Sequence, residues 1–431
     1  MIATLPAADD PRTLLGLSDE ALVERIQRQT LRFFWEGAER ASALAPDRRE
    51  REPGPLDDDD RVAIGGSGFG VMALIVAVER GWLAREVVIE RLDRMLALLV
   101  KAERYHGAFP HFVHGRNGAT SNFSDLDDGG DLVETALLFQ GLLCVRAYFD
   151  RDDPREASLR SRITGLWESV EWDWYTQGRD VLYWHWSPRH GWAIDHPIHG
   201  WNECLIAYVL ATAAPRHGID ARAYHRGFAS GRAFRNGNAY HGIELPLGQA
   251  YGGPLFFSHY SFCGLDPRGL RDRYADYWDL CVRHVGINRE HCIVNPNGFA
   301  GYGADCWGLT ASDDPAGYEP HAPDHDNGTI SPTAALSSLP YAPAEAMQAA
   351  RGMLERHGGN VWGRYGFVDA FNESKQWFAR TYLAIDQGPI VVMTENHRSG
   401  LLWNLFMRVP EVQEGLRRLG FSSPHLEQAA P

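Results

Sequence analysis

The densest group of side chains able to exchange protons lies between Asp125 and Glu134, where five of ten residues are acidic. If a helix begins near Gly130, Asp131 and Glu134 stand three residues apart on one face. Asp127 then lies just before the first helical turn. One or two acids suffice to cap a helix and favour its positive end, and five exceed that need. We predict Asp131 as a catalytic carboxylate, with Asp127 and Glu134 in contact with substrate.

Glu203 is predicted as a proton donor because its surroundings are apolar. It begins a strongly apolar helical stretch and is flanked by Trp201 and Cys204. A carboxyl group removed from water prefers its protonated form, which is what a general acid requires at neutral pH. The alternative is a solvated first-turn glutamate that only favours the helix dipole. We expect Trp201 to contact the same substrate.

A third acid, Asp386, stands where one predicted helix ends and Gly388-Pro389 precede the next. A negative charge at the carboxyl end of a helix is unfavourable, so an acid there indicates a function. We predict Asp386 as a further catalytic carboxylate. Either Asp131 or Asp386 would serve as base, held ionised by helix-end amides or by polar neighbours such as Gln387, which is also a candidate substrate contact.

Aromatic side chains are abundant, with 14 Trp, 16 Tyr and 19 Phe. Flat rings pair well with the C–H faces of sugars, so a saccharide cleft is one use for them. A hairpin is predicted with strands Val181–Trp186 and Trp192–Ile194. Alternation along the first strand places Trp184 and Trp186 on one face. These two rings either stack on substrate or pack beneath the hairpin.

Helical periodicity and Gly, Pro, Asn and Asp punctuation predict the elements that position these groups. A first helix begins at Ser18, which has the side chain of an N-cap. Further helices are expected near residues 69–80, 84–104, 131–149, 155–170, 201–213, 221–235, 271–284, 343–357, 373–384, 390–407 and 410–419.

About twelve helices with little sheet favour an all-α fold, an (α/α)₆ toroid with six inner and six outer helices and a small β-hairpin insertion. A helical solenoid is the alternative, but no fixed-period repeat is visible. Residues 1–17 are expected to be an N-terminal lead-in and residues 18–423 a single toroidal domain. The long loop near 295–331 is expected to be functional.

Composition excludes several classes of function. The net charge of −14 argues against nucleic acid and disfavours a polyanionic substrate. The six Cys lack metal-ligand spacing, so we expect buried free thiols. No apolar run is long enough to span a membrane. No secretory signal is visible, so the protein is expected to be cytoplasmic or an exported protein whose signal has been removed.

Four motifs in order resemble those of the bacterial glycoamylase-like domain, which is typified by β-1,2-glucanases and also occurs in cyclic β-1,2-glucan synthases. The resemblance runs from about residue 20 to 420. The motifs are Trp307-Gly308-Leu309-Thr310-Ala311-Ser312-Asp313, Gly328-Thr329-Ile330-Ser331-Pro332-Thr333-Ala334-Ala335, Tyr365-Gly366-Phe367-Val368-Asp369-Ala370-Phe371-Asn372 and Ile385-Asp386-Gln387-Gly388-Pro389.

The resemblance implies an (α/α)₆ toroid, no metal or cofactor, and hydrolysis of β-1,2-glucans with inversion. The family's cleft acids match Asp127, Asp131, Glu134 and Glu203, and Asp386 matches a further one. Trp307, in the first motif, is a candidate substrate contact. The family is usually exported, whereas no signal is visible here, and the Trp-rich hairpin departs from the family's pattern.

We therefore predict a glycoside hydrolase acting on a neutral β-1,2-glucan or related β-glucan, with Glu203 as general acid. Its partner is a poly- or oligosaccharide, and the oligomeric state stays open. One alternative is a polysaccharide lyase on the same toroid, with Tyr240-His241 or His259-Tyr260 abstracting a proton. Another is a non-catalytic glucan-binding or assembly protein.

Overall fold

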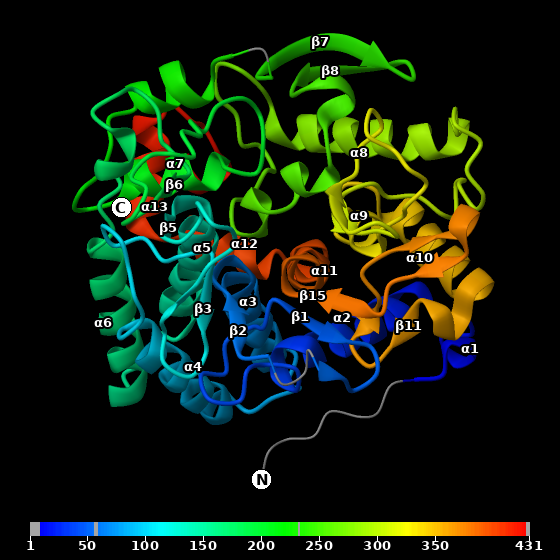
Figure 1. Cartoon of the computed structure of the whole chain (residues 1–431), viewed down its shortest axis with the longest axis horizontal. Helices are drawn as coiled ribbons and strands as arrows, with labels where there is room; N and C mark the ends of the chain where they lie inside the picture. The colour runs from blue at the N-terminus through cyan, green and yellow to red at the C-terminus, as the bar shows by residue number, and fades with distance from the viewer. Residues whose placement is uncertain (1–8, 56–58, 232, 428–431) are drawn as a thin grey trace.

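The computed structural model describes residues 9–55, 59–231 and 233–427. Helices dominate it (Figure 1). The α-helices are α1 (Pro11–Leu14), α2 (Asp19–Trp35), α3 (Ile64–Glu79), α4 (Arg85–Leu99), α5 (Leu132–Tyr148), α6 (Pro154–Glu168), α7 (Leu205–Ala213), α8 (Tyr277–Val294), α9 (Pro332–Leu336), α10 (Pro343–His357), α11 (Ala384–Ser399), α12 (Leu401–Met407), α13 (Pro410–Arg418) and α14 (Pro424–Glu427).

The remaining elements are short and lie in the connections between helices. Tight 3₁₀ turns are η2 (Trp174–Thr176), η4 (Ala250–Gly252), η5 (Leu255–Ser258), η6 (Ser261–Cys263), η7 (Gly358–Asn360) and η8 (Glu373–Lys375), and η3 (Ala223–Phe228) is a wider π-helical turn. The strands are β1 (Arg48–Glu50), β2 (Arg61–Ala63), β3 (Phe112–His114), β4 (Thr120–Ser121), β5 (Gly130–Asp131), β6 (His185–Trp186), β7 (Arg235–Tyr240), β8 (Ile243–Leu247), β9 (Ala311–Asp313), β10 (Tyr318–Pro320), β11 (Trp362–Gly363), β12 (Gly366–Phe367), β13 (Phe371–Asn372), β14 (Trp377–Phe378) and β15 (Thr381–Leu383).

Two kinds of helix are distinguished by their burial. Helices α3, α5, α7 and α11 are buried on nearly every side, whereas α2, α4, α6, α10 and α13 each bury one face. Helices surrounded by protein on all sides form the interior. In Figure 1, α11 stands near the centre of the view, and it contacts α2, α3, α9 and α12. We call the first set the inner helices and the second set the outer helices.

The inner helices α3 and α5 cross at glycines. A Cβ atom at Gly141 would lie 2.0 Å from the carbonyl oxygen of Gly68, far inside van der Waals contact. Only glycine allows the two backbones this approach. The close crossing brings the first turn of α3 against the first turn of α5, which is where the predicted acidic cluster ends.

Sheet pairing connects distant parts of the chain at the ends of the inner helices. Strand β1 pairs antiparallel with β15, with Arg48 opposite Leu383 and Glu50 opposite Thr381. Strand β5 pairs antiparallel with β6, with Asp131 opposite His185. Because α5 and α11 directly follow β5 and β15, these two small sheets fix the positions at which both helices begin.

Several sequence-based element predictions are wrong. Residues 373–384 form the turn η8 and strands β14 and β15, since Gln376 has a φ of 50° that interrupts a helix. Residues 221–235 keep only the π-helical turn η3. Residues 390–407 are divided by Gly400, with a φ of 71°, between α11 and α12. The short helix α9 and most of the strands were not predicted.

The predicted Trp-rich hairpin is confirmed only in part. The chain folds back on itself, with isolated antiparallel bridges joining Ser187 to Gly191 and Tyr183 to Pro197, but the two predicted strands do not pair with each other. Only His185–Trp186 forms a strand, and its partner is Gly130–Asp131 rather than Trp192–Ile194. Residues 192–194 lie in a turn. Backbone hydrogen bonds to the start of α5 hold this segment, which the local sequence pattern does not reveal.

Other predictions are confirmed. Ser18 caps α2, with its side chain accepting a hydrogen bond from the amide of Ala21. All six Cys are buried free thiols. Within the described residues, no helix is long and apolar enough to cross a membrane. Of the predicted lead-in, residues 1–8 lie outside the described part, and residues 9–17 include α1.

Candidate active site

Asp131 is the N-cap of α5, and its carboxylate is fully engaged. Oδ1 accepts hydrogen bonds from the amides of Val133 and Glu134, both at 2.9 Å. Oδ2 lies 3.1 Å from His111 Nδ1 and accepts a 3.1 Å hydrogen bond from Trp184 Nε1. With its side chain fully buried, Asp131 is placed to orient the residues around it.

Glu134, on the next turn of the same face, is held by α3. Its Oε2 accepts a 2.6 Å hydrogen bond from the amide of Gly65, and its Oε1 lies 3.9 Å from His111 Nε2. Burial raises the pKa of Glu134 to about 7, and the charge of Asp131 acts in the same direction. Burial opposes protonation of His111, but the nearby carboxylates raise its pKa to about 9. His111 therefore carries a positive charge at neutral pH, beside the carboxyl groups of Asp131 and Glu134.

Asp127 lies at the edge of this cluster, with Oδ1 3.2 Å from His185 Nε2. His111, Asp127 and Asp131 offer ligand atoms within 4.8 Å of one another, a spacing compatible with a metal ion. The oxygens that a cation would need on Asp131 already accept hydrogen bonds from protein donors. We assign no metal to this set, and the absence of a metal stays a prediction.

Glu203 lies two residues before α7, in the turn that leads into it. Its side chain is 7% exposed. The hydroxyl of Ser261 donates a hydrogen bond to its backbone carbonyl and fixes the turn. Burial, together with the charges of Asp131 and Glu134, raises the pKa of Glu203 to about 7. Glu203 therefore keeps its proton near neutral pH, in agreement with its apolar flanks.

A second acidic cluster surrounds Asp386. The sequence-based placement of Asp386 at a helix end is wrong, because it lies in the first turn of α11, where the dipole favours a negative charge. It faces the carboxyl group of Asp369 within hydrogen-bonding reach. Burial and Asp369 raise the pKa of Asp386 well above its ordinary value. Apart from this contact between the two acids, one oxygen of each carboxyl group is buried with no hydrogen-bond partner in the described part of the chain.

Arg48 and Asp313 complete the second cluster. Asp369 Oδ2 accepts a 2.7 Å hydrogen bond from the amide of Asp313. Arg48, on β1, forms an ion pair with Asp313 at 3.1 Å. Burial, reinforced by the charge of Asp313, raises the pKa of Asp369 to about 7. Since two adjacent buried carboxyl groups do not both ionise readily, Asp369 and Asp386 hold a shared proton.

Tyr260 lies between the two clusters. It is 6% exposed and packs against Phe69 and Phe256. Its pKa is raised well above the ordinary value by burial and by the charges of Asp386 and Glu203. Both carboxyl groups therefore lie near this one hydroxyl, and Asp386, Glu203, Asp131 and Glu134 belong to one acidic region.

The predicted aromatic contacts divide into three groups. Trp184 is partly exposed and bonds Asp131. Trp186 is partly exposed but packs edge-on against His106 and Trp174. Trp201 and Trp307 are 2% and 0% exposed, so neither presents a ring face to a ligand.

Gln387 is also buried, and its amide donates a 2.9 Å hydrogen bond to the carbonyl of Phe367. Its Nε2 therefore supports the backbone of β12. Gln387 lies next to Asp386 in α11. Its side-chain NH₂ group is directed to the carbonyl of Phe367 and not toward a ligand.

The sequence analysis does not single out His111, Asp313 or Asp369, and it names Tyr260 only as a possible proton-abstracting residue of the lyase alternative. Asp313 and Asp369 nonetheless lie inside the family motifs, and Asp369, between two apolar residues, is a visible signal. His111 carried no such signal, because its role depends on pairing with Asp131 across the fold.

A family model named Glycoamylase and described as "Putative glucoamylase" matches residues 195–410, half of the chain. The chain belongs to the glycoamylase family. The match includes Glu203, Asp313, Asp369 and Asp386. The acids at the start of α5 lie before the matched region.

Individual members of the glycoamylase family match over almost the whole chain. A protein of Parabacteroides distasonis, named exo β-1,2-glucooligosaccharide sophorohydrolase (non-reducing end), is 44% identical over 429 residues, and the match covers 94% of this chain. The chain spans 59% of the length of that relative.

Two solved structures align with this chain over nearly the full length of both chains. A putative glucoamylase from Bacteroides uniformis is 52% identical with a TM-score of 0.92, covering 95% of this chain and 99% of that one. An endo-β-1,2-glucanase from Chitinophaga pinensis, in complex with sophorotriose and glucose, is 51% identical with a TM-score of 0.92, covering 95% and 100%. The fold is shared across nearly the entire chain.

Proposed function

We propose that this protein hydrolyses β-1,2-linked glucans or glucooligosaccharides in a cleft of an (α/α)₆ toroid. The alternation of buried and half-buried helices supports the toroid. Two relatives of 44% and 51% identity carry names for this chemistry. The observation that carries the proposal is the protonation of Glu203, a buried carboxyl group with a pKa near 7. It belongs to the same acidic region as the buried carboxyl pair Asp369 and Asp386.

In the proposed reaction, Glu203 donates its proton to the glycosidic oxygen as the bond to the anomeric carbon breaks. A water molecule attacks that carbon from the opposite face and loses its proton to the Asp369–Asp386 pair. Asp386 is favoured over Asp131 as base, because all hydrogen-bonding positions of Asp131 are occupied. The anomeric configuration inverts, which calls for a separation of roughly 6.5–9.5 Å between acid and base.

The substrate is tested by incubating the protein with linear β-1,2-, β-1,3- and β-1,4-glucans and separating the products by chromatography. We expect new reducing ends from the β-1,2-glucan alone, with product length distinguishing endo from exo cleavage. An unsaturated sugar end with ultraviolet absorbance would instead indicate a lyase. Binding without product would indicate a non-catalytic glucan-binding protein.

The role of Glu203 is tested by Glu203→Gln, with Glu414→Gln as matched control because Glu414 is an exposed residue of α13 paired with Arg418. We expect Glu203→Gln to lose at least about 10²-fold in kcat while still binding substrate. In the wild type, kcat/KM should fall about tenfold per pH unit above about pH 7 as Glu203 ionises. Near-normal turnover in Glu203→Gln would remove it from the mechanism.

A further inference from the structure

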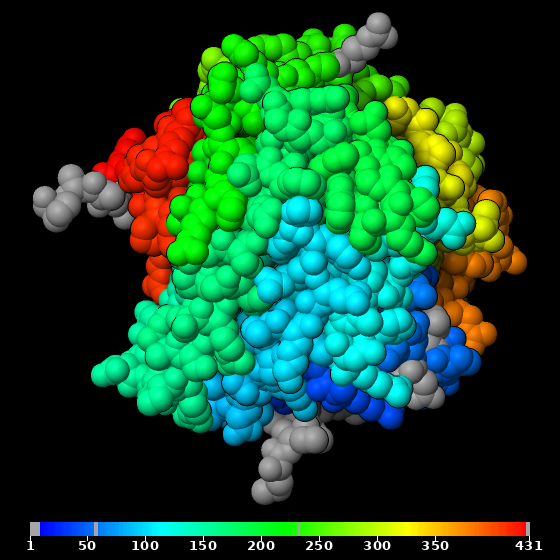
Figure 2. Space-filling view, turned by 60° about the vertical axis from the view of Figure 1, so that its left-hand side comes forward, coloured from blue at the N-terminus to red at the C-terminus, as the bar shows by residue number. Residues whose placement is uncertain are grey.

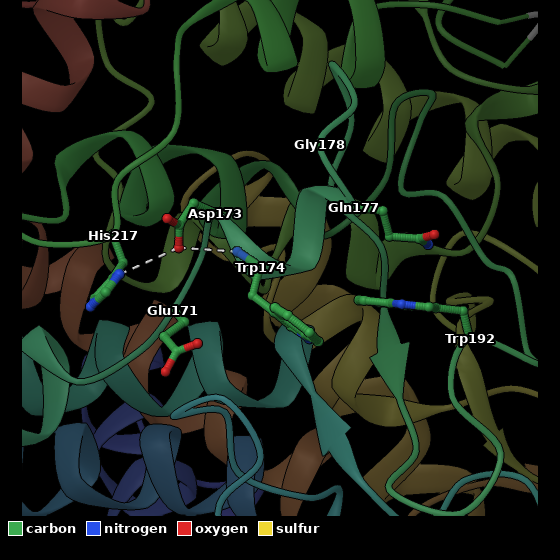
Figure 3. A pocket seen from close by; sticks show the side chains of 7 residues that line it. All are labelled: Glu171, Asp173, Trp174, Gln177, Gly178, Trp192 and His217. Atoms are coloured by element: carbon green, nitrogen blue, oxygen red, sulfur yellow. Dashed lines mark hydrogen bonds and ion pairs between the residues drawn. The ribbon is translucent and has the colours of Figure 1, made fainter.

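A pocket lined by none of the acids of the candidate active site lies at the surface, between segments that follow α6. It has a volume of about 510 Å³, within the usual range of small-molecule sites. Its lining includes Trp174 and Trp192 on one chain segment and His217 on another (Figure 3). Figure 2 shows the neighbouring surface, where residues near 100–125 in cyan lie beside the green segments that follow α5.

Trp174 forms a rigid platform in this pocket. Its side chain is 40% exposed, unusually open for a tryptophan in this chain. The ring of His106 stacks on it at 3.7 Å with an angle of 13°. His106 Nδ1 lies 2.8 Å from Glu171 Oε2, which fixes the imidazole. One face of Trp174 is therefore supported by protein, and the ring is held ready for a partner.

Trp192 adds a second ring. The centroids of Trp174 and Trp192 are 6.3 Å apart and their planes differ by 32°. Trp192 is itself held by edge contacts to Tyr175 and Tyr183. Two fixed indoles at this spacing present aromatic surface to an extended ligand rather than to a small ion.

The polar groups of the pocket suit hydroxyl groups. Gln177 Nε2 is buried and has no hydrogen-bond partner in the described part of the chain. The backbone of Gln177 is fixed in the left-handed region, with a φ of 52°, so its amide is directed by the turn. On the opposite side, Asp173 and Glu171 supply carboxylate acceptors, with His217 Nδ1 3.5 Å from Asp173 (Figure 3).

These features select the chemical class of the ligand. Two carboxylates in the lining disfavour an anionic ligand by like-charge repulsion. Aromatic faces combined with separate donors and acceptors match a neutral polyol with apolar C–H faces. We propose that this pocket binds glucosyl units of a neutral β-glucan chain, outside the site of bond cleavage; that the chain is the β-1,2-glucan rests on the proposed function.

The pocket is joined to the acidic region through Trp186. The ring of Trp186 meets Trp174 edge-on at 6.2 Å. The backbone of Trp186 pairs with Gly130, the residue before Asp131. A glucan chain occupying both places would be held on the two sides of the β5–β6 ladder.

The test measures binding of polymeric β-1,2-glucan and of sophorotriose by calorimetry in the Glu203→Gln background, which prevents turnover. Adding Trp174→Ala should weaken binding of the polymer about 3- to 10-fold, as expected for loss of one aromatic stacking contact, and should weaken sophorotriose binding less. Trp82→Ala, a partly exposed tryptophan next to Arg28, is the matched control and should bind as the parent does.

Gln177→Gly provides a second variant, because glycine accepts the positive φ while removing the unpaired amide. We expect it to weaken polymer binding in the same direction. Parent-like polymer affinity in both folded variants would overturn the proposal, as would tighter binding of an anionic polysaccharide. If the wild type hydrolyses no β-1,2-glucan but Trp174→Ala still weakens binding of another neutral β-glucan, the proposed function fails and the pocket stands.

Discussion

The two acidic clusters are built on opposite principles. At the start of α5, every hydrogen-bonding position of Asp131 is filled by a donor, and the buried charges alternate in sign with His111. At the start of α11, Asp386 faces another carboxyl group, and each keeps an oxygen without a donor. The hydrogen bonds around Asp131 fix the side chains of the first cluster. The two facing carboxyl groups of the second cluster share a proton that can be exchanged.

The comparison shows that burial alone does not identify a catalytic acid. Asp131 and Asp386 are 0% and 1% exposed. They differ in how the buried charge is compensated, since complete hydrogen bonding stabilises the ionised form and an adjacent carboxyl group disfavours it. Removing one member of each cluster should therefore have different consequences.

The largest expected effect is on turnover, from Asp386→Asn. Removing the proposed base should lower kcat for β-1,2-glucan by about 10²-fold or more. The free energy of unfolding at pH 8 should not fall, because the substitution removes a buried carboxylate repelled by Asp369. Initial rates and urea denaturation measure the two quantities. Asp279→Asn, at an exposed ion pair, is the control, and near-normal turnover would contradict the assignment.

The opposite outcome is expected of Asp131→Asn. Asparagine still caps α5, but its amide places a donor against His111 or Trp184 Nε1, which then lose their acceptor. We expect the free energy of unfolding to fall by about 1–3 kcal/mol, with a smaller loss of kcat than in Asp386→Asn. If Asp131→Asn is as stable as wild type and loses more activity, Asp131 is the base and the comparison is reversed.

The stored proton predicts a pH dependence of stability. Asp369 keeps its proton up to about pH 7 when folded but loses it near pH 4 when unfolded. The folded state thus binds more protons between these values, and the free energy of unfolding decreases as pH rises through them, by up to about 1.4 kcal/mol per pH unit. Asp369→Asn should flatten this decrease in urea titrations at pH 5 and 7.5. If the free energy of unfolding decreases with pH as much in Asp369→Asn as in the wild type, Asp369 and Asp386 do not share a proton.

The smallest expected effect is from Trp184→Phe. The ring is retained, but the hydrogen bond from Nε1 to Asp131 is lost. We expect a decrease of about 0.5–1.5 kcal/mol in the free energy of unfolding. Trp186→Phe is the matched control, because Trp186 does not bond Asp131. Equal effects of the two substitutions would show that ring packing, rather than the hydrogen bond, holds this segment.

The sequence predicts the first cluster better than the second. The three-residue spacing of Asp131 and Glu134 and the apolar flanks of Glu203 are local signals, and local structure follows them. Asp386 was a candidate for the wrong reason, since a helix was predicted before it where β15 lies. The pairing of Asp386 with Asp369 could not be inferred, because it depends on the backbone contact between Asp369 and Thr381 at the start of β15.

The aromatic residues show the same limit. Trp201 and Trp307 have polar neighbours in the sequence, yet both are core residues. Trp174, the more open ring, is not a candidate in the sequence analysis, because the local sequence shows neither its exposure nor the stacking of His106 from a distant segment. Alternation along a strand describes faces only where the strand exists, and Trp184 precedes the two-residue strand β6.

The pairing of β1 with β15 has a consequence for how the chain folds. It joins residues 48–50 to residues 381–383, one of the longest sequence separations possible in this protein, and contacts of that kind form slowly because a long loop must close first. During synthesis, β1 cannot pair with β15 until nearly the whole chain has left the ribosome. Only then can Asp386, which follows β15, be positioned near Arg48. The second acidic cluster is therefore completed late. A chain truncated before α11 lacks Asp386, so Asp369 has no carboxyl partner with which to share a proton.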